Sequence, residues 1–200
     1  MKNPFYTAMW RLGRPILLLL HPLEVSGKEN LPADEAVLLC ANHSSAWDPI
    51  LLMLALEGEY PLRVMAKKQL FEIPVVGGFL KMMGVFPVDR GNSDIGAIRT
   101  AIKSLRDGYS LLVFPEGTRV KVPGEVRPKG GVVMIGIRSG VKLLPVYIGT
   151  DKRLFHKVPI VIGETYAPAY TGRHGTAEEY QTGADEVMRR VYEMGGVECG

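Results

Sequence analysis

Short apolar runs separated by helix-length segments fill the sequence from residue 36 onward, and this alternation limits most strongly how the chain can fold. Most runs are apolar along nearly their whole length, which is typical of strands buried on both faces of a sheet. Because parallel strands need a crossover helix between them, the pattern predicts an α/β fold with a largely parallel central sheet flanked by helices. The predicted strands are 23–26, 36–41, 62–66, 85–88, 110–114, 142–148 and 159–162, and the predicted helices are 49–57, 68–82, 93–106, 131–139 and 176–195.

The length of 200 residues suits one well-packed domain and is short for two. We therefore expect a single α/β domain over residues 23–200, preceded by an N-terminal helix within residues 1–22. The two cysteines, Cys40 in an apolar run and Cys199 beside the C-terminus, suggest a reducing compartment and no disulfide framework.

The N-terminal segment combines apolar and basic side chains. Residues 1–20 contain three basic residues and no acidic one, and the apolar residues of 3–21 are spaced as in an amphipathic helix broken or kinked at Pro15. We expect this helix to lie in a membrane interface, with packing on the protein core as the alternative. Its leucine run is too short to span a bilayer and lacks a signal-peptide cleavage site. Its charge suits anionic lipid better than nucleic acid, because no basic run with interleaved aromatics occurs.

A histidine and a carboxylate follow the strand 36–41, at the sheet edge where ligands bind in open α/β folds. Asp48, five residues after His43, is placed to accept the imidazole Nδ1 proton, which leaves Nε2 free to take a proton from a hydroxyl. This spacing predicts a general base with an orienting partner. In the structural alternative, Asp48 before Pro49 is an ordinary helix N-cap, which gives His43 no role.

The nucleophile is expected to come from the substrate. Ser44 and Ser45 lie too close to His43 in sequence to be obvious triad partners, and no Gly-x-Ser-x-Gly elbow occurs. We therefore expect direct attack by a substrate hydroxyl. No metal-ligand spacing of His, Cys or carboxylates is present, so we expect no metal.

Two further polar clusters follow later strands. Arg90 stands before Gly91, and Arg119 follows Gly117 closely after the strand 110–114. Two arginines at one sheet edge, each near a glycine that lets backbone approach, are suited to bidentate binding of a phosphate. The alternative for each arginine is a surface ion pair. Glu116 is expected to orient Arg119 or to bind glycerol hydroxyls.

An apolar stretch follows the basic pair Lys67-Lys68. Pro74 and two glycines within residues 70–83 are incompatible with a regular spanning helix, yet the stretch is apolar enough to line a groove for an acyl chain. Core packing is the alternative, because most apolar stripes are buried in the core.

Four motifs in order resemble those of the glycerol-phosphate acyltransferase family, and within it the bacterial 1-acyl-glycerol-3-phosphate acyltransferase group. The resemblance covers roughly residues 25–165, and four ordered motifs are far more specific than one. The motifs are Asn42-His43-x-x-x-x-Asp48, Val85-Phe86-Pro87-Val88-Asp89-Arg90-Gly91, Phe114-Pro115-Glu116-Gly117-Thr118-Arg119 and Leu144-Pro145-Val146.

The resemblance implies a 1-acylglycerol-3-phosphate O-acyltransferase. Such an enzyme moves a fatty acyl group from acyl-carrier protein or acyl-CoA to the free sn-2 hydroxyl of lysophosphatidic acid, and gives phosphatidic acid for phospholipid biosynthesis. It implies no cofactor besides the thioester co-substrate, no nucleic-acid partner, and a peripheral position on the cytoplasmic face of the cell membrane.

The resemblance also implies roles for individual residues. His43 is the implied base and Asp48 its orienting partner, while Arg90 and Arg119 hold the phosphate. Lys68 is the alternative to Lys67 near that phosphate. The implied substrate-binding residues are Lys67, Arg90, Glu116, Gly117, Thr118 and Arg119.

Three other functions remain open at this point. An acyltransferase of the same fold with another lyso-lipid acceptor is the nearest, because the motifs constrain the chemistry more than the substrate. An acyl hydrolase is the second, since the same base is able to activate water. A non-catalytic lipid-binding module is the third, and the intact pair of His43 and Asp48 argues against it.

Overall fold

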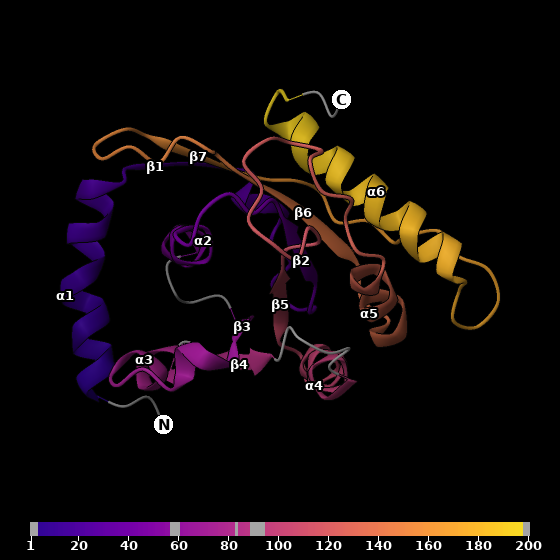
Figure 1. Cartoon of the computed structure of the whole chain (residues 1–200), viewed down its shortest axis with the longest axis horizontal. Helices are drawn as coiled ribbons and strands as arrows, with labels where there is room; N and C mark the ends of the chain where they lie inside the picture. The colour runs from indigo at the N-terminus through magenta and orange to yellow at the C-terminus, as the bar shows by residue number, and fades with distance from the viewer. Residues whose placement is uncertain (1–3, 57–60, 83, 89–94, 198–200) are drawn as a thin grey trace.

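The computed structural model describes residues 4–56, 61–82, 84–88 and 95–197. These residues form one α/β domain around a seven-stranded sheet with the order β1-β7-β6-β2-β5-β3-β4 (Figure 1). The largely parallel sheet expected from the alternating pattern is thereby confirmed. The strands are β1 (Leu23–Ser26), β2 (Leu38–Ala41), β3 (Leu62–Lys67), β4 (Val85–Val88), β5 (Ser110–Val113), β6 (Leu143–Ile148) and β7 (Val158–Ile162).

Strand direction changes at one place in the sheet. β2 pairs in parallel with β5 and β6, and β3 pairs in parallel with β4 and β5. β7 runs antiparallel to β6 and parallel to β1. A short loop joins β6 to β7, which suits an antiparallel pair, because a parallel pair needs a longer crossover.

Helices cover both faces of the sheet, with α1, α2 and α3 on one side and α4, α5 and α6 on the other (Figure 1). β2 shows how the chain supports two cores: Leu39 and Ala41 pack toward the first side, and Leu38 and Cys40 toward the second. Side chains of a strand alternate between faces, so a strand buried on both must be apolar throughout. The helices are α1 (Pro4–Leu20), α2 (Asp48–Ala55), α3 (Val76–Met82), α4 (Ile95–Arg106), α5 (Gly131–Ser139) and α6 (Ala177–Met194), with 3₁₀ turns η1 (Lys28–Asn30) and η2 (Lys68–Phe71).

The predicted helix over 68–82 is wrong as a single element. The chain forms η2, then a turn in which Val75 has φ 67°, and only then α3. Pro74 has no N–H to continue a helix. A side chain at Gly77 would place its Cβ 2.3 Å from the carbonyl oxygen of Phe71, so the tight reversal requires glycine there.

The N-terminal helix is present, and Pro15 lies within it without interrupting it, contrary to a break at that residue. Trp10, Leu17 and Leu18 pack against the core on the α2 side of the sheet. Among the described residues, no helix combines the length and apolarity that crossing a membrane requires.

Candidate active site

Three predicted site residues and one lysine that was not predicted lie at one edge of the sheet. His43 follows β2, Lys67 ends β3, Glu116 follows β5, and a loop after β6 carries Lys152. These four strands run parallel, so their carboxyl ends meet at the same edge. Residues that follow separate parallel strands therefore lie at one sheet edge in the described part of the chain.

The His43 imidazole is held by Asp48. Nδ1 of His43 lies 2.9 Å from Oδ2 of Asp48, and the same oxygen accepts hydrogen bonds from the backbone N–H groups of Ser44 and Ser45, each at 2.7 Å. An ionised carboxylate only accepts hydrogen bonds, so Nδ1 carries the proton and Nε2 remains the basic nitrogen. Asp48 begins α2, yet its carboxylate turns back onto the preceding loop.

The second oxygen of Asp48 faces a buried cation. Nζ of Lys152 lies 2.7 Å from Oδ1 of Asp48, and the Lys152 side chain is only 7% exposed. The ammonium also donates to Oγ of Ser44 and to the carbonyl oxygen of Gly149, each at 2.7 Å. Lys152 thus has one ion-pair partner and two hydrogen-bond acceptors within the loops that surround Asp48.

These contacts keep Asp48 ionised although it is completely buried. Burial by itself raises the pKa of the Asp48 carboxyl. The hydrogen bond from His43 and the charge of Lys152 outweigh burial and hold the pKa below its ordinary value. The site thus contains a carboxylate that is charged at neutral pH and available to stabilise an imidazolium.

Glu116 supports the backbone of His43. Oε2 of Glu116 accepts a hydrogen bond from the His43 N–H at 2.7 Å, and Oε1 accepts one from the hydroxyl of Tyr192 in α6. Glu116 is 2% exposed. Burial raises the pKa of its carboxyl, and the hydrogen bonds from Tyr192 and His43 offset only part of that effect. Its expected binding of the substrate stays a prediction.

Three further contacts hold the loop that carries His43. The imidazole stacks on the ring of Phe114, with centroids 4.1 Å apart and planes at 19°. The carbonyl oxygen of His43 accepts a hydrogen bond from Val120 N–H at 2.7 Å. Asn42, beside it, donates to the carbonyl oxygen of Ile148 and accepts from the Ile148 N–H, both at 2.8 Å, and so joins the ends of β2 and β6.

A pocket of about 390 Å³ opens beside His43. One part of its wall is polar, from His43, Lys67 and Arg119, and the rest is mostly apolar. The apolar stretch after Lys67 contributes to the wall and also packs against the core, and its role in holding an acyl chain stays a prediction. The apolar side chains include Trp10, Ile50, Met53, Leu70, Phe79, Leu80 and Phe114.

The other predicted site residues lie as follows. Arg90 is outside the described residues. Thr118 is exposed, and Gly117 has φ 68° at the turn that separates Glu116 from Arg119. Lys67, rather than its neighbour Lys68, lines the pocket. Within the described part of the chain, no three His, Cys, Asp or Glu side chains are grouped to hold a metal ion.

The sequence argument missed Lys152 and Tyr192. Lys152 stands four residues after the end of β6, beyond the fourth motif, so its position after a parallel strand was the available signal. Tyr192 lies in a helix 76 residues after Glu116, and no local pattern indicates their contact.

Comparison with known proteins adds to this geometry. A family model described as Acyltransferase matches residues 22–149. A relative from Bacillus subtilis named 1-acyl-sn-glycerol-3-phosphate acyltransferase is 35% identical over 184 residues, which are 90% of this chain and 91% of that protein. A relative of the same name from Borreliella burgdorferi is 33% identical over 75% of this chain and 57% of its own length.

A solved structure supports the same assignment. The crystal structure of the 1-acyl-sn-glycerophosphate (LPA) acyltransferase PlsC from Thermotoga maritima superposes with a TM-score of 0.72 at 29% identity. The match covers 99% of this chain and 85% of that one. The likeness therefore includes the sheet and the elements that carry the site.

Proposed function

The chain belongs to the acyltransferase family and is an acyltransferase, and we propose that its acceptor is lysophosphatidic acid and its product phosphatidic acid, made for phospholipid biosynthesis. Relatives that carry this activity in their names support the acceptor. The donor is an acyl thioester, on acyl-carrier protein or coenzyme A.

One observation carries the proposal. The pocket that contains the paired imidazole of His43 also contains Lys67 and Arg119, while the rest of its wall is mostly apolar. A lysophosphatidic acid needs all three features: a base for its hydroxyl, cations for its phosphate and an apolar surface for its acyl chain.

The proposed reaction is one acyl transfer with one proton relay. The acceptor hydroxyl gives its proton to Nε2 of His43 while its oxygen attacks the thioester carbonyl carbon. Asp48 stabilises the imidazolium through Nδ1. The tetrahedral intermediate collapses, the carbon–sulfur bond breaks, and the leaving thiolate takes the proton from His43. General acid–base catalysis of this kind contributes about 10² to 10⁴ in rate.

Cations position the acceptor in this proposal. Arg119 and Lys67 line the pocket and are suited to hold the phosphate, with Arg90 as the further cation indicated by its motif. Holding the phosphate fixes the hydroxyl near His43 and contributes through orientation. The apolar wall receives an acyl chain.

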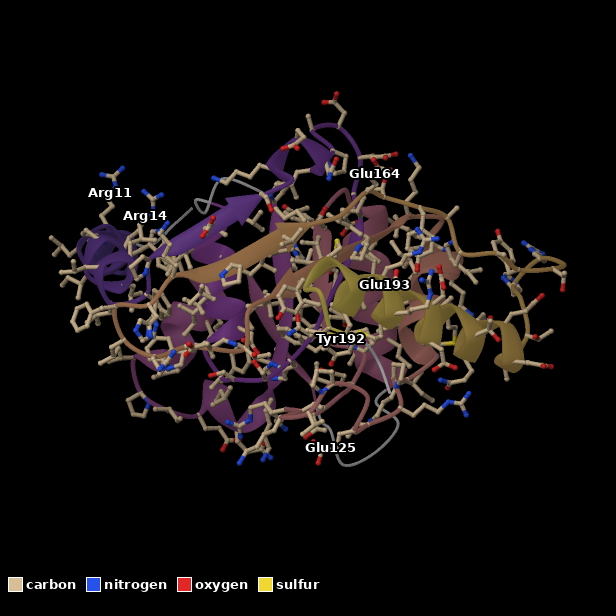
Figure 2. All side chains as sticks on the ribbon, turned by 90° about the horizontal axis from the view of Figure 1, so that it is seen from above. Arg11, Arg14, Glu125, Glu164, Tyr192 and Glu193 are labelled. Atoms are coloured by element: carbon tan, nitrogen blue, oxygen red, sulfur yellow. The ribbon has the colours of Figure 1, made fainter. Side chains whose placement is uncertain are left out.

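Contact with a membrane surface belongs to the same proposal. Leu12, Ile16 and Leu19 of α1 are 73%, 59% and 67% exposed and recur at helical spacing on one face. Figure 2 shows that Arg11 and Arg14 project from α1 as well. An exposed apolar stripe with cations on the same helix fits the interface of an anionic bilayer.

A second exposed apolar pair lies beside α1. Leu154 and Phe155 are 55% and 64% exposed, and the N–H of Phe155 donates to the carbonyl oxygen of Leu20 at 2.7 Å. Trp10 of α1 lines the active-site pocket. The proposed lipid-contacting face thus adjoins the pocket, and we place the enzyme peripherally on the cytoplasmic membrane face.

Acyl transfer measured directly tests the proposal. The purified protein is assayed in liposomes with acyl-CoA and with acyl-carrier protein, against lysophosphatidic acid and a panel of other lyso-lipids. We expect phosphatidic acid, with a loss of about a hundredfold or more in His43→Ala and normal turnover in His174→Ala, which alters an exposed histidine.

Other outcomes identify the alternatives. Turnover only with another lyso-lipid would replace the acceptor and keep the chemistry. Release of free fatty acid without any acceptor would identify a hydrolase. An unchanged rate in a folded His43→Ala variant would exclude His43 as the base.

A further inference from the structure

We propose that Lys152 is a positioning residue for the reaction, a buried cation that locks Asp48 in place and keeps His43 in its neutral, proton-accepting form. The inference rests on the proposed role of His43 as the base. It concerns a residue outside the four motifs and four residues beyond β6.

Geometry is the first argument. Nζ of Lys152 contacts Oδ1 of Asp48, Oγ of Ser44 and the carbonyl oxygen of Gly149, each at 2.7 Å. Two of these groups belong to the loop and helix start that present His43, and the third belongs to the strand end joined to that loop by Asn42. Lys152 thus contacts the Asp48 oxygen that His43 leaves free and ties it to the surrounding loops.

The second argument is that the two oxygens of the Asp48 carboxylate have different partners. Oδ2 of Asp48 is used by the His43 ring and two backbone N–H groups, and Oδ1 by Lys152. With both oxygens held, the carboxylate has a fixed orientation, and so does the Nδ1–H that it accepts. A buried carboxylate and ammonium stabilise each other, whereas either one alone is strongly unfavourable in the interior.

Charge balance is the third argument. A lone buried carboxylate beside His43 favours the imidazolium, and a protonated His43 cannot accept a proton from the substrate. Lys152 makes its pair with Asp48 neutral overall, so the imidazolium is favoured less in the resting enzyme.

The other groups around His43 are held by contacts of their own. Glu116 accepts from its backbone N–H, Phe114 stacks on its ring, and Lys67 and Arg119 line the same pocket. We expect substitution of Lys152 to leave these contacts in place. A change in the titration of His43 in such variants then reports the charge on Asp48 and its partner, together with Glu116, whose carboxyl interacts electrostatically with both His43 and Asp48.

The test compares two neutral variants with one charged variant. Lys152→Gln can still donate a hydrogen bond, Lys152→Met keeps only the apolar stem, and Lys152→Arg keeps the charge. Lys157→Gln is the matched control, because Lys157 lies in the same loop and its side chain is 73% exposed. Circular dichroism and thermal unfolding confirm that each variant is folded.

Two readouts are measured. The first is the NMR titration of the His43 Cε1–H signal in the ligand-free protein, identified among the four histidines by its loss in His43→Ala. The second is kcat/KM for acyl transfer as a function of pH. The NMR readout needs no substrate, so absent wild-type turnover would contradict the proposed function and leave this inference testable.

The expected result is a shift of the titration midpoint and of the acid limb of kcat/KM to higher pH by about one unit in both neutral variants. The kcat/KM of the neutral variants is then about tenfold below that of the wild type at low pH and closer to it at high pH. Lys152→Arg and Lys157→Gln follow the wild type at every pH. A folded neutral variant with an unshifted titration, or a Lys152→Arg variant shifted like the neutral ones, would overturn the proposal. A rate lowered equally at every pH would do the same.

Discussion

The carboxylate of Glu116 accepts a hydrogen bond at 2.7 Å from the backbone N–H of His43, across 73 residues of sequence. The other oxygen of that carboxylate accepts from Tyr192 of α6. A helix on one side of the sheet is thereby connected to His43 through one buried glutamate. Changes in α6 are therefore expected to affect the candidate active site.

Tyr192→Phe is the first substitution to examine. It removes the hydroxyl donor and leaves a buried carboxylate oxygen of Glu116 without it, so we expect a loss of about 1 to 3 kcal/mol in the free energy of unfolding and a lower kcat. Urea unfolding and the transfer assay measure the two effects. Tyr166→Phe is the matched control, because the buried Tyr166 hydroxyl makes no hydrogen bond with any described residue. Equal stability of the two variants would contradict the importance of the Tyr192 contact.

Gly117→Ala is expected to lower activity by more than its loss of stability explains. Gly117 has φ 68°, where a side chain costs about 1 kcal/mol, and an added Cβ would lie 2.8 Å from Cε of Lys129. Gly108 has φ 86° with open space around its Cβ position, so Gly108→Ala carries the backbone strain alone. We expect the two variants to have similar melting temperatures. Only Gly117→Ala is expected to lose activity, with kcat/KM at least about tenfold lower than in the wild type. Matched activities would show that the turn at Gly117 tolerates a side chain.

Membrane contact predicts a vesicle-binding defect without a folding defect. Leu19→Glu and Phe155→Glu each place a charge on an exposed apolar position. We expect partitioning onto anionic vesicles to fall by about tenfold or more, because one buried leucine or phenylalanine contributes roughly 1.5 to 3 kcal/mol. Sedimentation with vesicles measures it.

The control for this prediction is Tyr170→Glu. Tyr170 is 45% exposed and lies beside the first turn of α6, and α6 and α1 are on opposite sides of the molecule (Figure 1). Wild-type partitioning of Leu19→Glu and Phe155→Glu, or an equal loss in Tyr170→Glu, would rule out the α1 face as the contact.

Acid weakens an ion-pair cluster on α6. Hydrogen bonding to Arg189, with a further contribution from Arg190, lowers the pKa of Glu186 from 4.5 to about 2 against the opposing effect of burial. A lowered pKa in the folded state stabilises the protein above about pH 4.5, and this contribution is lost as pH falls toward 2. The groups are largely exposed, so we expect Glu186→Gln to cost about 1 kcal/mol or less at pH 7, and less than half of that at pH 3. Urea unfolding at both pH values checks this, and a difference that is independent of pH and of 1 M salt would contradict it.

The spacing of residues in the sequence predicts the features that depend on nearby residues or on the order of strands and helices. The alternation of apolar runs predicts the sheet, because parallel strands and their crossover helices follow from it. His43 follows β2 and Asp48 begins α2, so the two residues are joined by a short loop, and five residues of sequence suffice to predict the contact that the structure shows. The convergence of His43 and Glu116 also follows, since both come after parallel strands.

Tertiary contacts account for what the sequence does not reveal. The contacts of the two Glu116 oxygens with His43 and Tyr192 were not predicted, because they join residues far apart in sequence. Lys152 resembles any loop lysine until the fold brings it onto Asp48. The reversal at Gly77 depends on a carbonyl oxygen six residues away, so the periodicity of 68–82 alone suggested one helix.

Trp10 belongs both to α1 and to the wall of the pocket, where its ring lies 6.3 Å from that of Phe79. Part of the wall of the pocket that we propose receives the acyl chain is thus carried by the helix that we propose rests on lipid. Preference for short or long fatty acids then becomes a joint property of the protein and its bilayer. Chain-length profiles recorded in detergent micelles are expected to differ from those recorded in vesicles, and bilayer thickness becomes a variable of the assay.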